Sequence, residues 1–148
     1  MVEVQATFRT PPGSPGPDGR PIDVEQGIAW TLRFPGGAIA HCTSAYDFAS
    51  VKRIQVMGER PSLSLDPATE YARNRLVVRR KSGQEEPTLG ESAEQFTGEI
   101  DAFAAAIREG REPHHGSARD GLQDVRLMTL IYEAARTGRT VAVPPLDA

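Results

Sequence analysis

Several features that define common functional classes are missing from this sequence. A single cysteine, Cys42, excludes an internal disulfide. No apolar run approaches the roughly 20 residues that a membrane-spanning helix needs. A formal net charge of −3 provides no electrostatic attraction to nucleic acid or to an acidic membrane. We therefore expect neither a nucleic acid nor a membrane among the partners.

A phosphate-binding loop is also missing. Gly36-Gly37 lacks the G-x-G-x-x-G spacing and falls in a predicted hairpin rather than between a strand and a helix. We therefore expect no dinucleotide site of the Rossmann kind, and no bound cofactor, in this chain.

What the chain does have is the composition of one globular domain. Hydrophobic residues make up 39% and charged residues 25% of its 148 residues, and both values argue against disorder. The length is that of a single domain, which we place at residues 1–148.

The first two thirds read as strands and turns. Apolar and polar residues alternate from Val2 to Arg9, and Asp23–Phe34, Ala38–Tyr46 and Val51–Met57 are further predicted strands. Shorter strands are predicted at Ser62–Leu65 and Arg75–Arg79, before a polar loop at Lys81–Glu91. Val24, Ile28, Trp30, Leu32 and Phe34 are predicted to share one face of a strand, with Glu25 on the other.

The last third changes to helical spacing. Phe96, Ile100, Phe103 and Ile107 predict one helix, with a capping box at Ser92 and an end at Gly110. A second helix is predicted from Ser117 and Asp120 to Gly138, buried on two sides, before a strand at Thr140–Val143.

Strands followed by helices indicate an α+β fold. We expect a large, mainly antiparallel open sheet with two C-terminal helices packed on one face. The opposite face would then expose residues such as Trp30 or Ile39, and an exposed apolar face is typical of a partner surface. The pattern alone does not assign residues to the two faces.

The candidates for metal or nucleophile chemistry are few. His114-His115 lies in a predicted loop without further ligands at a zinc-like spacing, so we expect no metal site. His41 and Cys42 are neighbours on a strand and face opposite sides. Cys42 has no cation placed to lower its pKa and is interpreted as a small buried hydrophobe.

Two tyrosines, Tyr46 and Tyr71, are better candidates for binding. Tyr46 ends a predicted strand, where a side chain can line a site that a rigid sheet supports. Packing in the core is the alternative interpretation for both.

The order of several segments resembles the glucose–fructose oxidoreductase / inositol dehydrogenase (Gfo/Idh/MocA) family. Asp120–Leu127 followed by Ile131–Arg139 resembles the closing helix of this family. The helix that begins near Phe96 is similar to the one before it. Trp30–Phe34, with Gly37, His41 to Tyr46 and Asp66–Thr69, looks like the glucose–fructose oxidoreductase branch.

The resemblance implies a two-domain parent enzyme that moves a hydride between NAD or NADP and a sugar or polyol. In that family an N-terminal Rossmann domain holds the nucleotide and a lysine in a Glu-Lys-Pro segment, which this sequence lacks. The remaining acid/base residues lie before the first sheet strand. We therefore expect no catalytic residue here, no activity of the isolated chain, and a missing N-terminal Rossmann domain as its partner.

The resemblance also implies substrate contacts and self-association. Tyr46 and Phe96 are the predicted substrate-binding residues, since relatives often place an aromatic near the nicotinamide at the position of Phe96. The family often pairs subunits through the open sheet, so we expect a homodimer, sheet face to sheet face. The compartment is cytoplasmic by default, although some relatives are exported.

A second hypothesis has no catalytic partner. A stand-alone α+β binding or interaction module fits the succession of strands and then helices equally well. A reading frame that continues upstream into a G-x-G-x-x-G segment would favour the oxidoreductase.

Overall fold

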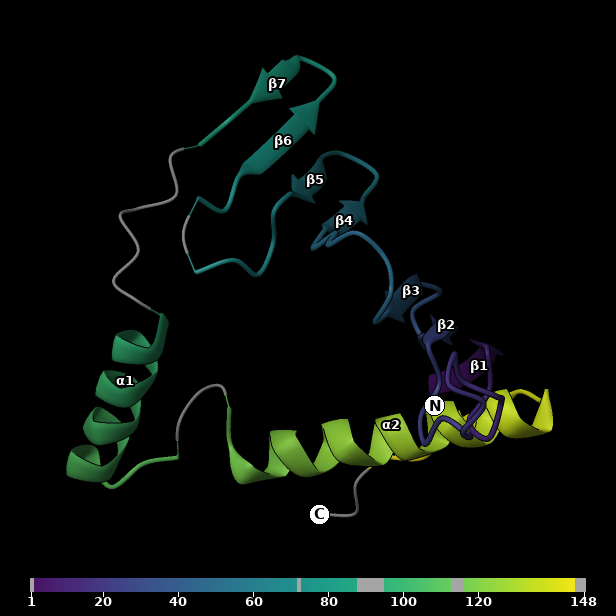
Figure 1. Cartoon of the computed structure of the whole chain (residues 1–148). Helices are drawn as coiled ribbons and strands as arrows, with labels where there is room; N and C mark the ends of the chain where they lie inside the picture. Colours follow the sequence, from purple (N-terminus) through teal and green to yellow (C-terminus); the bar gives the residue numbers. More distant parts are fainter. Residues whose placement is uncertain (1, 72, 88–94, 113–115, 146–148) are drawn as a thin grey trace. The chain divides into compact units, whose positions relative to one another are not determined.

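The computed structural model describes residues 2–71, 73–87, 95–112 and 116–145. Its elements follow the order strands, two helices, strand (Figure 1). They are β1 (Val2–Arg9), β2 (Gly27–Arg33), β3 (Ile39–Ala45), β4 (Ile54–Met57), β5 (Ser62–Leu65), β6 (Leu76–Arg80), β7 (Gly83–Glu85), α1 (Gln95–Glu109), α2 (Ala118–Thr137) and β8 (Val141–Val143). The predicted α+β class is confirmed.

The chain divides into two compact units. Unit 1 comprises Met1–Phe48 and His114–Ala148, and unit 2 comprises Ala49–Pro113. The strands form two four-stranded antiparallel sheets, one in each unit, instead of one large sheet. Of the two helices, α2 belongs to unit 1 and α1 to unit 2.

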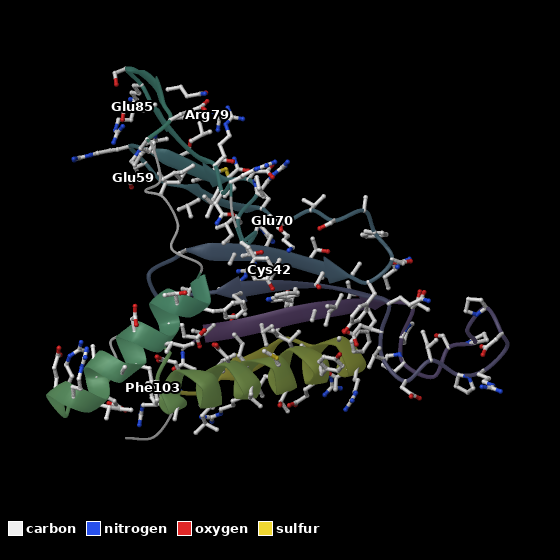
Figure 2. All side chains as sticks on the ribbon, turned by 60° about the vertical axis from the view of Figure 1, so that its left-hand side comes forward. Cys42, Glu59, Glu70, Arg79, Glu85 and Phe103 are labelled. Atoms are coloured by element: carbon white, nitrogen blue, oxygen red, sulfur yellow. The ribbon has the colours of Figure 1, made fainter. Side chains whose placement is uncertain are left out.

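The sheet of unit 1 has the order β3-β2-β1-β8. Val4 pairs with Leu32, and Trp30 pairs with both Ala6 and Cys42, so these side chains share one face. The helix α2 runs along that face, as Figure 2 shows.

The core of unit 1 lies between α2 and this face. Val4 and Ala134 are fully buried, and Ile28, Leu32 and Ile131 are nearly so. Trp30 packs against this cluster, whereas Ile39 lies on the opposite face and is 55% exposed, an assignment that the sequence pattern left open. The antiparallel register places Ala40 of β3 opposite Leu32 of β2, on the side of the sheet that packs against the core.

Both ends of α2 follow the sequence signals. The Ser117 hydroxyl accepts from the backbone N–H of Asp120, and the Asp120 carboxylate accepts from the backbone N–H of Ser117. Gly138 ends the helix with a φ of 65°, a left-handed conformation that glycine adopts without strain. Only one side of α2 is buried, because Leu122, Val125 and Met128 are all more than half exposed. The predicted burial on two sides is therefore wrong for this structure.

The sheet of unit 2 has the order β4-β5-β6-β7. The strand β7 lies in the segment that the sequence predicts as a polar loop. Its polar residues carry no apolar alternation, and it forms by pairing with β6 after a two-residue turn. Ser92, the predicted cap of α1, lies outside the described residues.

Several strand boundaries also differ from the prediction. The strand predicted from Asp23 begins at Gly27, so Val24 precedes it and is 50% exposed.

No helix in the described parts is long and apolar enough to cross a membrane.

Candidate functional site

The predicted substrate residue Tyr46 follows the last residue of β3. Its backbone N–H donates to the carbonyl of Gln26 at 3.0 Å, and its side chain is 80% exposed. The phenol therefore projects into solvent from a backbone that β2 holds. Tyr46 therefore does not pack in the core of unit 1, and its role in binding stays a prediction.

A buried carboxyl group lies near Tyr46. Glu25 is only 7% exposed, although the sequence places it on the solvent side of a strand. It accepts a hydrogen bond from the hydroxyl of Tyr132 on α2. Glu25 precedes β2, so the alternation of that strand does not apply to it. The sequence contains no signal for this pairing, because 107 positions separate the two residues.

The environment of Tyr132 perturbs its ionisation. The hydrogen bond to Glu25, together with burial, raises the pKa of Tyr132 to about 12, and Tyr46 adds a smaller electrostatic contribution. The ring of Phe8 meets that of Tyr132 edge-on with centroids 5.4 Å apart. The guanidinium of Arg136 lies 5.8 Å from the Tyr132 ring centroid. Tyr132 is therefore held as a neutral hydrogen-bond donor at neutral pH.

The opposite side of the same sheet end carries an ion pair. Arg9 pairs with Asp47, and its guanidinium lies 4.7 Å from the ring centroid of Phe48. Gly27 makes this possible, since a Cβ there would lie 3.1 Å from the Arg9 Nε. The hydrogen bond from Arg9 lowers the pKa of Asp47.

The sheet face opposite α2 is called here the open face. It consists mainly of small or neutral polar residues, which the strand register places together. They are Glu3, Gln5, Thr7, Arg9, Gly27, Ala29, Thr31, Arg33, Ile39, His41, Thr43 and Ala45. At its centre is a shallow depression, where Thr31 Oγ1 and His41 Nδ1 lie 3.0 Å apart. The open face is thus more polar than the sequence pattern predicts.

The second predicted substrate residue, Phe96, belongs to unit 2. Its ring lies 5.7 Å from that of Tyr71, tilted by 42°, and the residue is 51% exposed. Ile100, Phe103 and Ile107 continue an exposed apolar stripe along α1, on which Figure 2 labels Phe103. A common cleft for Tyr46 and Phe96 stays a prediction, because the two residues belong to different units.

The described residues contain no group of three or more His, Cys, Asp or Glu side chains that could hold a metal. His114 and His115 lie outside them. Cys42 faces α2, opposite to His41, and partial burial raises the pKa of its thiol. This agrees with its interpretation as a small hydrophobe rather than a nucleophile.

The described residues do not suit a dinucleotide. All strand pairings among them are antiparallel, so they contain no parallel βαβ unit. Gly36-Gly37 lies in the hairpin turn between β2 and β3, where the Gly37 N–H donates to the carbonyl of Phe34.

Sequence and structure comparisons identify relatives of this chain. A D-xylose 1-dehydrogenase [NADP(+)] from Haloarcula marismortui is 27% identical over 113 residues, 76% of this chain and 31% of that protein. The aldose-aldose oxidoreductase from Caulobacter crescentus, solved with glycerol, is 33% identical with a TM-score of 0.84. That match covers 96% of this chain and 41% of the other.

A levoglucosan dehydrogenase in complex with NADH and levoglucosan shares the fold, with a TM-score of 0.78 and 22% identity. The match covers 98% of this chain and 45% of the other. The chain thus spans less than half the length of these relatives.

A family model described as the oxidoreductase family, C-terminal alpha/beta domain, matches residues 2–143, which spans both units. The resemblance seen in the sequence is thereby confirmed. The chain belongs to the Gfo/Idh/MocA oxidoreductases, as their C-terminal domain.

Proposed function

We propose that this chain is the substrate-side and subunit-contact domain of an NAD(P)-dependent oxidoreductase that acts on CH–OH groups of sugars or polyols. One observation carries the proposal: the family match runs through residues 2–143, while the similar aldose-aldose oxidoreductase extends well beyond the matched region. The two units then act together as one domain, since a single family model spans both.

In this proposal the nucleotide and the main catalytic groups belong to an N-terminal Rossmann domain. The isolated chain then binds NADP weakly or not at all and oxidises no sugar. Isothermal titration calorimetry of the 148-residue chain with NADP tests this division. Micromolar binding would contradict it, as would turnover of D-xylose by the isolated chain.

The apolar stripe of α1 supports a further partner surface. Four large side chains at helical spacing are more than half exposed there, and monomers rarely expose a contiguous patch of this kind. We assign this stripe to the contact with the nucleotide-binding domain. Joining that domain to the chain should protect α1 amides from hydrogen exchange, and unchanged protection would remove the assignment.

Tyr46 and Phe96 are the proposed contacts to the sugar. The exposed phenol of Tyr46 can exchange hydrogen bonds with sugar hydroxyls, and the exposed ring of Phe96 offers an apolar surface. In the two-domain protein, Tyr46→Phe should change the sugar KM or kcat while the melting temperature stays near that of the wild type. Unchanged KM and kcat for the sugar would remove Tyr46 from the proposed sugar contacts.

The open face is the proposed homodimer contact. One central row of the open face consists of the short, neutral side chains of Thr7, Ala29 and Thr43, which permit close packing of one sheet on a second copy. A stable pairing buries on the order of 1,600 Å², and a twofold axis is its commonest symmetry.

Light scattering coupled to size exclusion tests the dimer directly. Thr7→Glu places a charge at the centre of the open face and should shift the chain to monomer. Val125→Glu, on the exposed side of α2, is the matched control and should leave the dimer intact. A wild-type monomer at tens of micromolar would exclude the dimer for this chain.

A further inference from the structure

Glu25 is a buried carboxyl group that has no part in the proposed chemistry. The alternation of β2 does not account for its burial either. Burying such a group costs free energy unless donors satisfy it. Tyr132 supplies the donor from α2, and its ring is in turn held by Phe8 and Arg136. The Glu25–Tyr132 pair therefore joins the helix to the segment that enters β2.

The residue after Glu25 connects the ends of three strands. The backbone N–H of Gln26 donates to the carbonyl of Thr10, directly after β1, at 3.3 Å. The carbonyl of Gln26 accepts from the N–H of Tyr46, directly after β3, at 3.0 Å. Restraint applied at Glu25 therefore passes through one residue, Gln26, to the backbone of Tyr46.

We propose that Glu25 and Tyr132 are positioning residues for Tyr46. Their hydrogen bond fixes the backbone at Gln26, which sets the direction in which the exposed phenol of Tyr46 meets a hydroxyl-rich ligand. The inference rests on the proposed function insofar as that ligand is a sugar or polyol. A group that recognises a ligand gains affinity when its backbone is held in advance, because less conformational entropy is lost on binding.

Hydrogen exchange of the Tyr46 amide in the 148-residue chain tests the pair without any ligand. Tyr132→Phe removes the donor, and Glu25→Gln replaces a charge-assisted acceptor by a neutral one. We expect Tyr132→Phe to speed exchange at Tyr46 by about tenfold or more, and Glu25→Gln to speed it by a smaller factor. The amide of Leu32 in the core should keep its rate in both variants.

Glu3→Gln is the matched control, because it removes a carboxylate from the open face of the same sheet. It should leave exchange at Tyr46 within about threefold of the wild-type rate, a change well below that of losing a buried hydrogen bond. Wild-type exchange at Tyr46 in folded Tyr132→Phe would overturn the inference. If Glu25→Gln unfolds the chain, Trp30 fluorescence reports it, and Tyr132→Phe alone decides.

Kinetics of the two-domain protein separate the two proposals. Tyr132→Phe should raise the KM for D-xylose by about threefold or more, as loss of preorganised contact predicts, with the nucleotide KM unchanged. An unchanged sugar KM in Tyr132→Phe, where Tyr46→Phe does raise it, would refute the positioning role. If Tyr46→Phe itself has no kinetic effect, the sugar role of Tyr46 fails, while the exchange experiment still decides whether the pair holds its backbone.

Discussion

Unit 1 buries one face of its sheet against a helix, whereas unit 2 leaves several large aliphatic side chains exposed, among them Ile54, Val56 and Ile100. In unit 1, α2 covers Val4, Ile28 and Leu32. In unit 2, every residue of β4 is exposed. The buried hydrophobic residues among the described part of unit 2 are Ala68, Val77, Val78 and Ala106.

Ion pairs join the segments of unit 2 where apolar contacts are few. Lys52 lies 3.1 Å from Glu70, Arg53 lies 2.6 Å from Asp66, and Arg75 lies 2.6 Å from Glu86. Half-exposed pairs of this kind contribute little free energy, because water already solvates both charges. Unit 1 thus has a buried core between its sheet and α2, whereas unit 2 leaves more of its apolar surface exposed.

Replacing one isoleucine by alanine in each unit tests most directly whether the two units differ in the stability that their apolar side chains provide. Ile131→Ala, in the core of unit 1, should lower the free energy of unfolding by about 2–5 kcal/mol, since it removes buried methyl groups and leaves a cavity. Ile100→Ala removes the same atoms from a residue that is 66% exposed and should change stability by about 0.5 kcal/mol or less. Urea unfolding measures both, and equal losses would contradict the contrast.

High pH should lower the free energy of unfolding of unit 1 through the ionisation of Tyr132. The pKa of Tyr132 is raised from 10.0 to about 12, so the folded state holds this proton more tightly than the unfolded state. The resulting stability is fully present below pH 10 and is lost as the pH rises towards 12. Tyr132→Phe should therefore flatten the fall of the urea midpoint across this window. A slope identical to that of the wild type would show that the phenol carries no such linkage.

The stability of α2, which packs on the sheet of unit 1, should depend on its N-terminal cap at Ser117. Ser117→Ala removes the acceptor for the Asp120 N–H and should lower stability by about 1 kcal/mol. Thr97→Ala, on the exposed surface of α1, is the counterpart in unit 2 and should have little effect, because alanine favours helix and no cap is lost. Thermal unfolding of the two variants compares the helices directly.

The smallest expected effect concerns an ion pair of unit 2. Glu70→Gln should lower stability by about 0.5 kcal/mol or less, and added salt should reduce the difference. Glu59→Gln is the control, since Glu59 has no ion pair among the described residues (both positions are labelled in Figure 2). A larger loss of stability for Glu70→Gln would mean that ion pairs stabilise unit 2 more than the exposure of their side chains implies.

Periodicity and capping signals predict most element types correctly. Alternation identifies β1 and β2, and the signals at Ser117 and Gly138 bound α2 as observed. These features depend on neighbours within a few positions, where backbone geometry links residue type directly to conformation. By contrast, β7 has no such signal, because it is a strand only through its pairing with β6.

For the candidate site, local pattern predicts Tyr46 at a strand end and an unreactive Cys42. It misplaces Glu25, because its burial depends on a tyrosine far along the chain. It also leaves the two sheet faces unassigned, because alternation shows which residues lie together but not which set α2 covers.

The chain's own residues thus specify its class, the ends of α2 and its family, through short-range geometry and the order of its motifs. The division into two units, the burial of Glu25 beside Tyr132 and the passage of Arg9 over Gly27 arise from tertiary contacts. Such contacts depend on which distant segments meet and on the space between them. Periodicity carries no information about either, so these features become visible only once the sheet and α2 have been brought together.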